Sequence, residues 1–209
     1  MATTWFTSDL HLGHPFIAEL RGFAEVEEHD RVILDNLAKS LNSGDELWVL
    51  GDISSGWEPQ EERALNQLAE LFAQFRGGAD PLRAYLISGN HDSSHPLHEW
   101  AYTRQPRFLE VFDAVQERQV MHWQDPQGED REVWLSHFPR PGYEHAGMES
   151  RFDELRLNVP YLLHGHLHSS APVTAPGQVD MGVEAWGLAP VKQEEVMATL
   201  WESTRKKAG

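Results

Sequence analysis

Short apolar runs in this sequence end in side chains that can bind a metal or move a proton. The run 84–87 leads into Gly89, Asn90, His91 and Asp92. Asn90 offers a neutral oxygen, His91 a nitrogen or a proton, and Asp92 a carboxylate able to orient that imidazole. Gly89 has no Cβ, which allows a tight turn or a close approach of the backbone. The same residues also suit an ordinary Asx-turn, so their interpretation depends on the other strand ends.

Other apolar segments end in groups of the same kind: Asp9, His11, Asp52, His137, His166 and His168. With His91, these positions hold five of the twelve histidines. In an open α/β sheet, ligands bind at the carboxyl ends of the strands, so we expect these side chains to converge there. Nitrogen and oxygen ligands without sulfur suit Mn, Fe, Zn, Co or Ni rather than a structural zinc finger. Two metals that share one carboxylate need about seven protein groups. The six groups named above and Asn90 make seven when His91 is set aside.

The elements that must position these groups alternate between strand and helix in the first half of the chain. Apolar residues are contiguous in the strands and recur at helical spacing between them. The pattern predicts strands over 3–7, 46–50 and 84–87 and helices over 30–41 and 65–75. This order implies right-handed crossovers and a parallel sheet.

The second half of the chain predicts antiparallel strands. Segments 115–123 and 131–137 flank Asp125-Pro126-Gln127-Gly128, which suits a hairpin connection. A strand ending at Leu163, a strand over 178–185 and a closing helix around 196–201 follow. We find no repeat or linker and expect one domain over 1–209.

A polar stretch over 140–158, which contains Tyr143 and His145, separates two of these strands. A segment of this length beside a site is a candidate lid or specificity element, or else a surface loop. The roles of His14, His164, Tyr143 and Trp186 stay open. If the strand continued beyond Leu163, His164 would share one face with His166 and His168.

The charge balance is strongly acidic, with 17 basic and 33 acidic residues and a net charge of −16. Such a field repels polyanions, so binding to long nucleic acid or to an anionic membrane is disfavoured. The chain has no cysteine, which excludes disulfides and thiolate-bound metals. It shows no signal-peptide pattern and no apolar run of membrane-spanning length, so we expect a cytoplasmic protein.

The ordered set of motifs resembles that of the calcineurin-like metallophosphoesterases: Asp9-x-His11, Gly51-Asp52, Gly89-Asn90-His91-Asp92, His137 and Gly165-His166-x-His168. The opening 7–14 and the segment 181–186 look like the small bacterial and phage members. The resemblance implies an α/β fold in which two sheets form a sandwich flanked by helices. It also implies that Asp9, His11 and His168 bind one metal, that Asn90, His137 and His166 bind the other, and that Asp52 bridges them.

Two departures from the family pattern bear on the activity. The second motif often continues as Gly-Asp-x-x-Asp, but Ser55 stands at the last position here, so no supporting carboxylate is guaranteed. The third motif ends in Asp92, whereas the Ser/Thr protein phosphatases have Gly-Asn-His-Glu and an Asp-Arg-Gly after the second motif. This argues against a protein phosphatase.

The resemblance therefore implies a dinuclear-metal-dependent hydrolase of phosphodiesters or small phosphorylated metabolites, in which a metal-activated hydroxide attacks phosphorus. His91 is implied as the general acid, and Asp92 either holds His91 in its useful tautomer or only stabilises the turn. Mn is the first ion to test, with Fe, Zn, Ni and Co as alternatives. The competing hypotheses are a nuclease or nucleotide phosphatase of the same fold, a hydrolase of another ester or amide, and a non-catalytic metal-binding scaffold.

Overall fold

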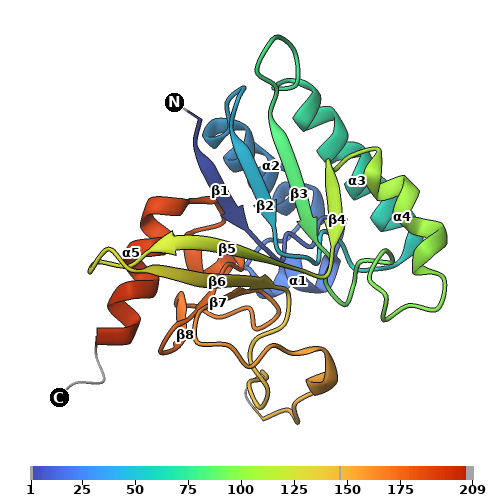
Figure 1. Ribbon diagram of the computed structural model, residues 1–209. Helices are drawn as coiled ribbons and strands as arrows, with labels where there is room; N and C mark the ends of the chain where they lie inside the picture. The colour runs from blue at the N-terminus through green and yellow to red at the C-terminus, as the bar shows by residue number, and fades with distance from the viewer. Residues whose placement is uncertain (1, 146, 206–209) are drawn as a thin grey trace.

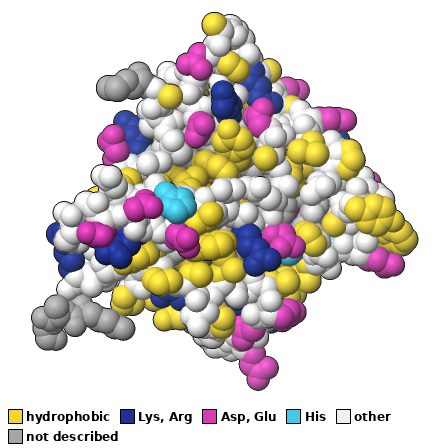
Figure 2. Space-filling view, viewed as in Figure 1, with side chains coloured by type: hydrophobic (Ala, Val, Ile, Leu, Met, Phe, Trp, Pro, Cys, Tyr) yellow, Lys and Arg dark blue, Asp and Glu magenta, His cyan; other side chains and the backbone are white. Residues whose placement is uncertain are grey.

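The computed structural model describes residues 2–145 and 147–205, which form two five-stranded sheets flanked by helices (Figure 1). The α/β architecture with two sheets agrees with the expected fold. Among the helices described, none is long and apolar enough to cross a membrane. On the face shown in Figure 2, basic side chains are scattered among acidic ones and form no continuous patch.

The first sheet contains, in spatial order, β10 (Val191–Lys192), β1 (Thr4–Thr7), β2 (Glu46–Val49), β3 (Arg83–Ile87) and β4 (Ala114–Gln116). Strands β1 to β4 pair in parallel, and β10 is antiparallel to β1. The helices between them are α1 (Pro15–Leu20), α2 (Val26–Ser40), α3 (Glu58–Ala73) and α4 (Ala101–Leu109). The predicted parallel crossovers through α2 and α3 are confirmed, whereas α1 and α4 were not predicted.

The second sheet contains β5 (Arg118–Gln124), β6 (Asp130–Ser136), β7 (Leu162–His164), β9 (Gln178–Asp180) and β8 (Val173–Ala175). Strands β5 and β6 form the predicted antiparallel hairpin. Helix α5 (Gln193–Arg205) contacts β8 and β9, and a 3-10 turn, Asp153–Leu155, lies in the stretch before β7.

Two predicted strands are corrected by the structure. Segment 115–123 is divided, because β4 pairs with β3 in the first sheet while β5 pairs with β6 in the second. The strand predicted over 178–185 ends at Asp180, whose carboxylate accepts the amide of Gly182 at 2.8 Å and turns the chain. A 3-10 helix, Val183–Trp186, follows.

Strands β1, β2 and β3 of the first sheet are mostly buried on both faces. Trp5 and Leu47 pack with α2 and α3 on the outer face, while their neighbours Phe6 and Trp48 pack with the second sheet and α5 on the inner face. This division follows from the alternation of side chains along a strand. Each large apolar side chain buried in this way contributes about 1.5–3 kcal/mol, so the two layers hold the strand ends firmly.

Glycines at the strand ends allow the following turns to lie against one another. A Cβ on Gly51, where φ is +95°, would lie 2.6 Å from the amide nitrogen of Gly89. A Cβ on Gly89 would collide with the carboxylate of Asp52, and one on Gly165 would lie 2.5 Å from Oδ2 of Asp9. Each of these motif glycines is therefore required by close approach, and Gly51 also by its positive φ.

We expect Gly165→Ala to lower the free energy of unfolding by about 1–3 kcal/mol, because its neighbours are packed and cannot move apart freely. Gly77→Ala is the matched control, since a Cβ there would meet nothing within 4 Å. Urea denaturation of the metal-free proteins measures both effects. Equal losses in the two variants would contradict the close-approach argument.

Candidate metal centre

Strand ends from both sheets meet in one region of the molecule. The first sheet supplies four of the seven predicted ligands and the second supplies three: Asp9 and His11 after β1, Asp52 after β2, Asn90 after β3, His137 after β6, and His166 and His168 after β7. A site at the junction of two sheets can be completed only when both are folded and packed.

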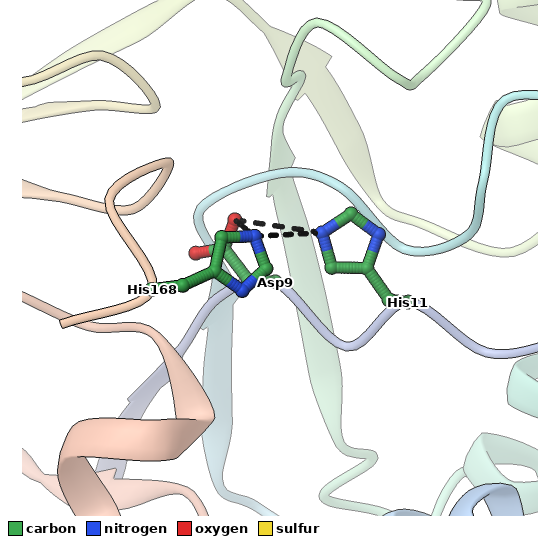
Figure 3. Close-up of side chains that lie close together, drawn as sticks. All are labelled: Asp9, His11 and His168. Carbon is green, nitrogen blue, oxygen red and sulfur yellow. Dashed lines mark hydrogen bonds and ion pairs between the residues drawn. The ribbon is translucent and has the colours of Figure 1, made fainter. Parts of the chain in front are cut away.

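Asp9, His11 and His168 form the first group of side chains (Figure 3). The Nε2 atoms of His11 and His168 lie 3.1 Å apart. Oδ1 of Asp9 lies 4.0 Å from Nε2 of His11 and 3.8 Å from Nε2 of His168. Two imidazole nitrogens and one carboxylate oxygen therefore face a common point.

Asn90, His137 and His166 form the second group. Oδ1 of Asn90 lies 3.1 Å from Nε2 of His137 and 2.9 Å from Nδ1 of His166. The carboxylate of Asp52 adjoins both groups, because its Oδ2 lies 3.4 Å from Nε2 of His137 and 3.8 Å from Nε2 of His11. The structure thus brings all seven predicted ligands together around one shared carboxylate.

Each of the four histidines among the predicted ligands is held through the ring nitrogen that faces away from the other ligands. The partners of these nitrogens are oxygen atoms: the Ser54 carbonyl for His11 (3.0 Å), the Leu50 carbonyl for His137 (2.7 Å), Glu184 for His168 (2.7 Å) and Glu144 for His166 (3.1 Å). An oxygen acceptor fixes the N–H on its own side of the ring, so the other nitrogen directs its lone pair to the centre. This donor set fits divalent transition-metal ions.

The charge of the centre also favours a cation. Burial lowers the pKa of His137, but the carboxylate of Asp52 raises it by more, to about 10. A proton on His137 thus supplies positive charge beside a carboxylate that is 2% exposed. A divalent ion would supply the same charge more effectively, since metal binding displaces protons from its ligands.

Backbone strain is concentrated at the same residues. Within the described part of the chain, seven non-glycine residues have positive φ, and five of them are predicted ligands: Asp9, His11, Asp52, His166 and His168. Each such residue raises the conformational energy by about 1–2 kcal/mol. This strained conformation is kept only where other contacts fix the backbone.

Glu184, which we did not predict, orients His168. Its Oε1 accepts from Nδ1 of His168 at 2.7 Å and from Nη2 of Arg21 at 2.6 Å. Arg21 also donates to the main-chain carbonyls of Asp9 and Leu10, at 2.6 and 3.0 Å. Burial raises the pKa of Glu184, but the contacts with His168 and Arg21 bring it down to about 2, so the carboxylate is ionised at neutral pH.

Glu144 is the counterpart of Glu184 on the other histidine of the last motif. Its Oε1 lies 3.1 Å from Nε2 of His166, and its Oε2 accepts from Arg156 at 2.8 Å. The side chains of Glu144 and Arg156 are 2% and 0% exposed. Both belong to the stretch 140–158, which is therefore part of the wall of the site. Its length and position were the only signals of this role in the sequence.

Asp92 holds a turn and does not orient His91. Nδ1 of His91 lies 3.0 Å from the carbonyl of Ser55. The buried carboxylate of Asp92 accepts from three backbone amides: Asp52 (2.9 Å), Gly89 (2.7 Å) and Ile53 (3.0 Å). The hypothesis that Asp92 sets the tautomer of His91 is thus corrected in favour of the turn-stabilising alternative. The main-chain carbonyl of Ser55 orients His91 instead.

The structure shows where the four residues of open role lie: His14, His164, Tyr143 and Trp186. His14 lines the cavity over the site. His164 is buried and bonded to Gly165 and Thr174, and because β7 ends there it shares no strand face with His166 or His168. Trp186 donates to the carbonyl of Asp180, and Tyr143 accepts from Arg156 through its main chain. His164 and Trp186 thus make structural contacts through their side chains, whereas the contact of Tyr143 involves its main chain alone and its side chain is 38% exposed.

A cavity of about 420 Å³ opens over the two groups of ligands. It is lined by predicted ligands, by His91 and by residues of two flanking segments: His14, Phe16, Ile17, Leu20 and Arg21 from the region of α1, and His145 and Arg151 from the stretch 140–158. Volumes of this size are usual for small-molecule sites.

Clustered imidazoles and carboxylates at strand ends, under a small cavity, are the arrangement expected of a metal-dependent hydrolase. A model of the calcineurin-like phosphoesterases matches residues 2–170, so the chain belongs to this family. Membership implies divalent metal ions and hydrolysis of phosphoesters in general.

Relatives of the chain occur in phages. The gene 66 protein of Mycobacterium phage L5 is 36% identical over 196 residues, which cover 90% of this chain and 89% of the relative. The gene 66 protein of Mycobacterium phage D29 is 35% identical over 203 residues, covering 94% and 96%. Both alignments extend over nearly the whole chain.

Among solved structures, the protein of unknown function AQ665 from Aquifex aeolicus matches with a TM-score of 0.66 and 23% identity, covering 95% of this chain and 100% of that one. This likeness supports the fold. The phosphopantetheinyl hydrolase PptH from Mycobacterium tuberculosis matches with a TM-score of 0.32 and 20% identity, over 71% of this chain and 47% of that one.

We expect Glu184→Gln and Glu144→Gln each to weaken Mn²⁺ binding about 10- to 100-fold, because a carboxylate that orients a ligating histidine contributes this much affinity. Isothermal titration of the metal-free proteins measures the effect. The exposed Glu70→Gln on α3 removes one charge elsewhere and is the control. Affinities equal to that of the control would show that these carboxylates do not support the centre.

Proposed function

We propose that the protein is a dinuclear-metal-dependent phosphoesterase that hydrolyses phosphodiesters or small phosphorylated metabolites. The observation that carries the proposal is the position of Asp52, whose single carboxylate adjoins both groups of ligands. In this proposal one ion is held by Asp9, His11 and His168, the other by Asn90, His137 and His166, and Asp52 is shared. Mn²⁺ is the first ion to test.

The protein's own residues position the substrate and move the proton. When bound, the two ions supply Lewis acidity to the phosphoryl group and a nucleophile near neutral pH. His91 is proposed as the general acid. Because its Nδ1 is held by the Ser55 carbonyl, Nε2 of the protonated ring can donate to the leaving oxygen. The amide of His91 donates to Oδ1 of Asp52 at 2.9 Å, which ties the acid to the shared carboxylate.

A small substrate is supported by the size and charge of the molecule. A cavity of about 420 Å³ holds a small phosphoester, and the net charge of −16 opposes a long polyanion. Arg21, one of two arginines among the described residues that line the cavity, is already paired with Glu184. These features favour a small-molecule phosphoesterase over a nuclease acting on long nucleic acid.

The direct test is turnover of a chromogenic phosphodiester by Mn²⁺-loaded protein. We expect activity, its loss on chelation, and two metal ions per chain by elemental analysis. Protein that holds both ions but is inert towards mono- and diesters would favour the non-catalytic scaffold. At most one ion in fully reconstituted protein would contradict the dinuclear centre.

Two substitutions separate a shared ligand from an unshared one. Asp52→Asn removes the negative charge that adjoins both groups, so we expect it to lose metal at both positions. His168→Ala should weaken mainly one. If Asp52→Asn kept both ions tightly, the shared role of Asp52 would be wrong.

We expect His91→Ala to retain both metal ions and to lose about 10²- to 10⁴-fold in kcat/KM for an alkyl diester, whose leaving group needs a proton. A nitrophenolate departs without one, so the loss on a nitrophenyl diester should be much smaller. Steady-state kinetics of wild type and variant on the two substrates measure the difference. Equal losses would remove the general-acid assignment.

A further inference from the structure

A short helix beside the proposed metal centre presents apolar side chains to the cavity. Phe16, Ile17 and Leu20 of α1 line the cavity, and we refer to these three residues as the apolar shelf. Phe16 and Leu20 are 61% and 67% exposed. Large apolar side chains that face water beside a site are typical of surfaces that contact a ligand.

The apolar shelf is held in place by polar contacts. Arg21, which follows α1 directly, donates to the main-chain carbonyls of Asp9 and Leu10 and to the carboxylate of Glu184. Within α1 itself, only Ala18 is fully buried. Because Arg21 fixes the end of the helix, Phe16 and Leu20 are not needed to anchor it and are available to a ligand.

Phe16, at the start of the apolar shelf, lies on the side of the cavity where the proposed proton donor stands. The ring of His14 lies 6.4 Å from that of His91 and 6.4 Å from that of Phe16, measured between centroids. The buried Nδ1 atom of His14 has no hydrogen-bond partner among the described residues. The rings of His91, His14 and Phe16 therefore lie in sequence along this side of the cavity. Nδ1 of His14 is the buried polar atom there that lacks a hydrogen-bond partner within the described part of the chain.

Another side of the cavity has a different chemistry. His145 and Arg151 line it, and the ring of His145 lies 5.3 Å from that of His166. The main chain of Arg151 is held by Glu144 and Arg156, while its guanidinium makes no ion pair with any residue that the structure describes. The cavity is thus apolar near His91 and cationic near the stretch 140–158.

We propose that the apolar shelf and His14 form the subsite for the leaving group, so that the substrate is a phosphodiester whose departing alcohol carries an aromatic or extended apolar group. This inference rests on the proposed function. During hydrolysis, the oxygen of water bonds to phosphorus and one proton of that water is released to solvent, while the P–O bond to the alcohol breaks. His91 gives its proton to the departing oxygen and regains one from solvent after the alcohol leaves.

The proton transfer fixes the orientation of the substrate. Because the departing oxygen stands beside His91, its carbon substituent extends past His14 onto the apolar shelf. An aromatic ring there buries apolar area and can stack against Phe16. The other ester group, which stays on phosphorus, then faces His145 and Arg151. A small or hydrophilic alcohol gains nothing from the shelf.

A mixed diester tests this orientation within one molecule. In ethyl 2-phenylethyl phosphate the two alcohols have similar acidity, so the enzyme's choice reports binding rather than leaving-group chemistry. We expect Mn²⁺-loaded wild type to release 2-phenylethanol over ethanol by about tenfold or more, measured by chromatography of the products. Preferential release of ethanol would overturn the proposal, since the phenyl group would then lie elsewhere.

Variants identify the residues responsible for the preference. Phe16→Ala and Leu20→Ala should each lower the ratio of the two alcohols towards one, whereas Leu109→Ala, an exposed leucine of α4, should leave it unchanged. The ratio does not depend on the amount of folded enzyme, so partial loss of protein cannot imitate the effect. An unchanged ratio in Phe16→Ala and in Leu20→Ala would contradict the role of the apolar shelf.

A binding measurement separates this inference from the proposed function. Titration of Mn²⁺-loaded protein with 2-phenylethylphosphonate and with ethylphosphonate requires no turnover. We expect about tenfold tighter binding of the phenyl compound and loss of that difference in Phe16→Ala. Equal affinities in wild type would overturn the leaving-group subsite. Discrimination by a protein inert towards every ester would leave the subsite in place and overturn the catalytic proposal.

Discussion

The burial of two carboxylates at the junction of the sheets is the constraint on which the rest of the structure depends. Asp9 and Asp52 are 0% and 2% exposed, and an unpaired carboxylate at such depth is strongly unfavourable. Backbone amides meet part of this demand: His166 donates to Asp9 at 3.1 Å and His91 to Asp52 at 2.9 Å. The remaining negative charge favours a bound cation, and the four imidazoles around the pair are placed to hold one.

Two carboxylate–arginine pairs extend the centre into the surrounding structure. Glu184 with Arg21 supports His168, and Glu144 with Arg156 supports His166. Each pair also anchors a segment that borders the cavity: Arg21 fixes the end of α1, and Arg156 fixes the stretch 140–158. The contacts that orient the histidines are therefore the same contacts that shape the cavity. Weakening either pair should disturb both the predicted metal ligands and the wall above them.

Much of the fold follows from patterns that are local in the sequence. The runs ending at Thr7, Leu50 and Ile87 predicted strands that the structure contains to within one residue, because both faces of the first sheet are buried. Prediction failed where burial is incomplete or where a side chain turns the chain, as at β4, α4 and Asp180. At β4 the pairing with β3, a tertiary contact, sets the boundary, whereas at Asp180 a local hydrogen bond from the amide of Gly182 to the carboxylate sets it.

The sequence by itself determined which candidate donors lie at strand ends, because an apolar strand of fixed length delivers the next polar residues to a sheet edge. It did not determine how those donors are oriented. Arg21 and Glu184 are 163 residues apart, and Asp92 binds the amides of Asp52 and Ile53, 40 and 39 residues away, in preference to the adjacent His91. Such pairs form wherever packing brings a buried charge and a free donor together. No local spacing encodes them, so only the tertiary structure decided which side chains support the site.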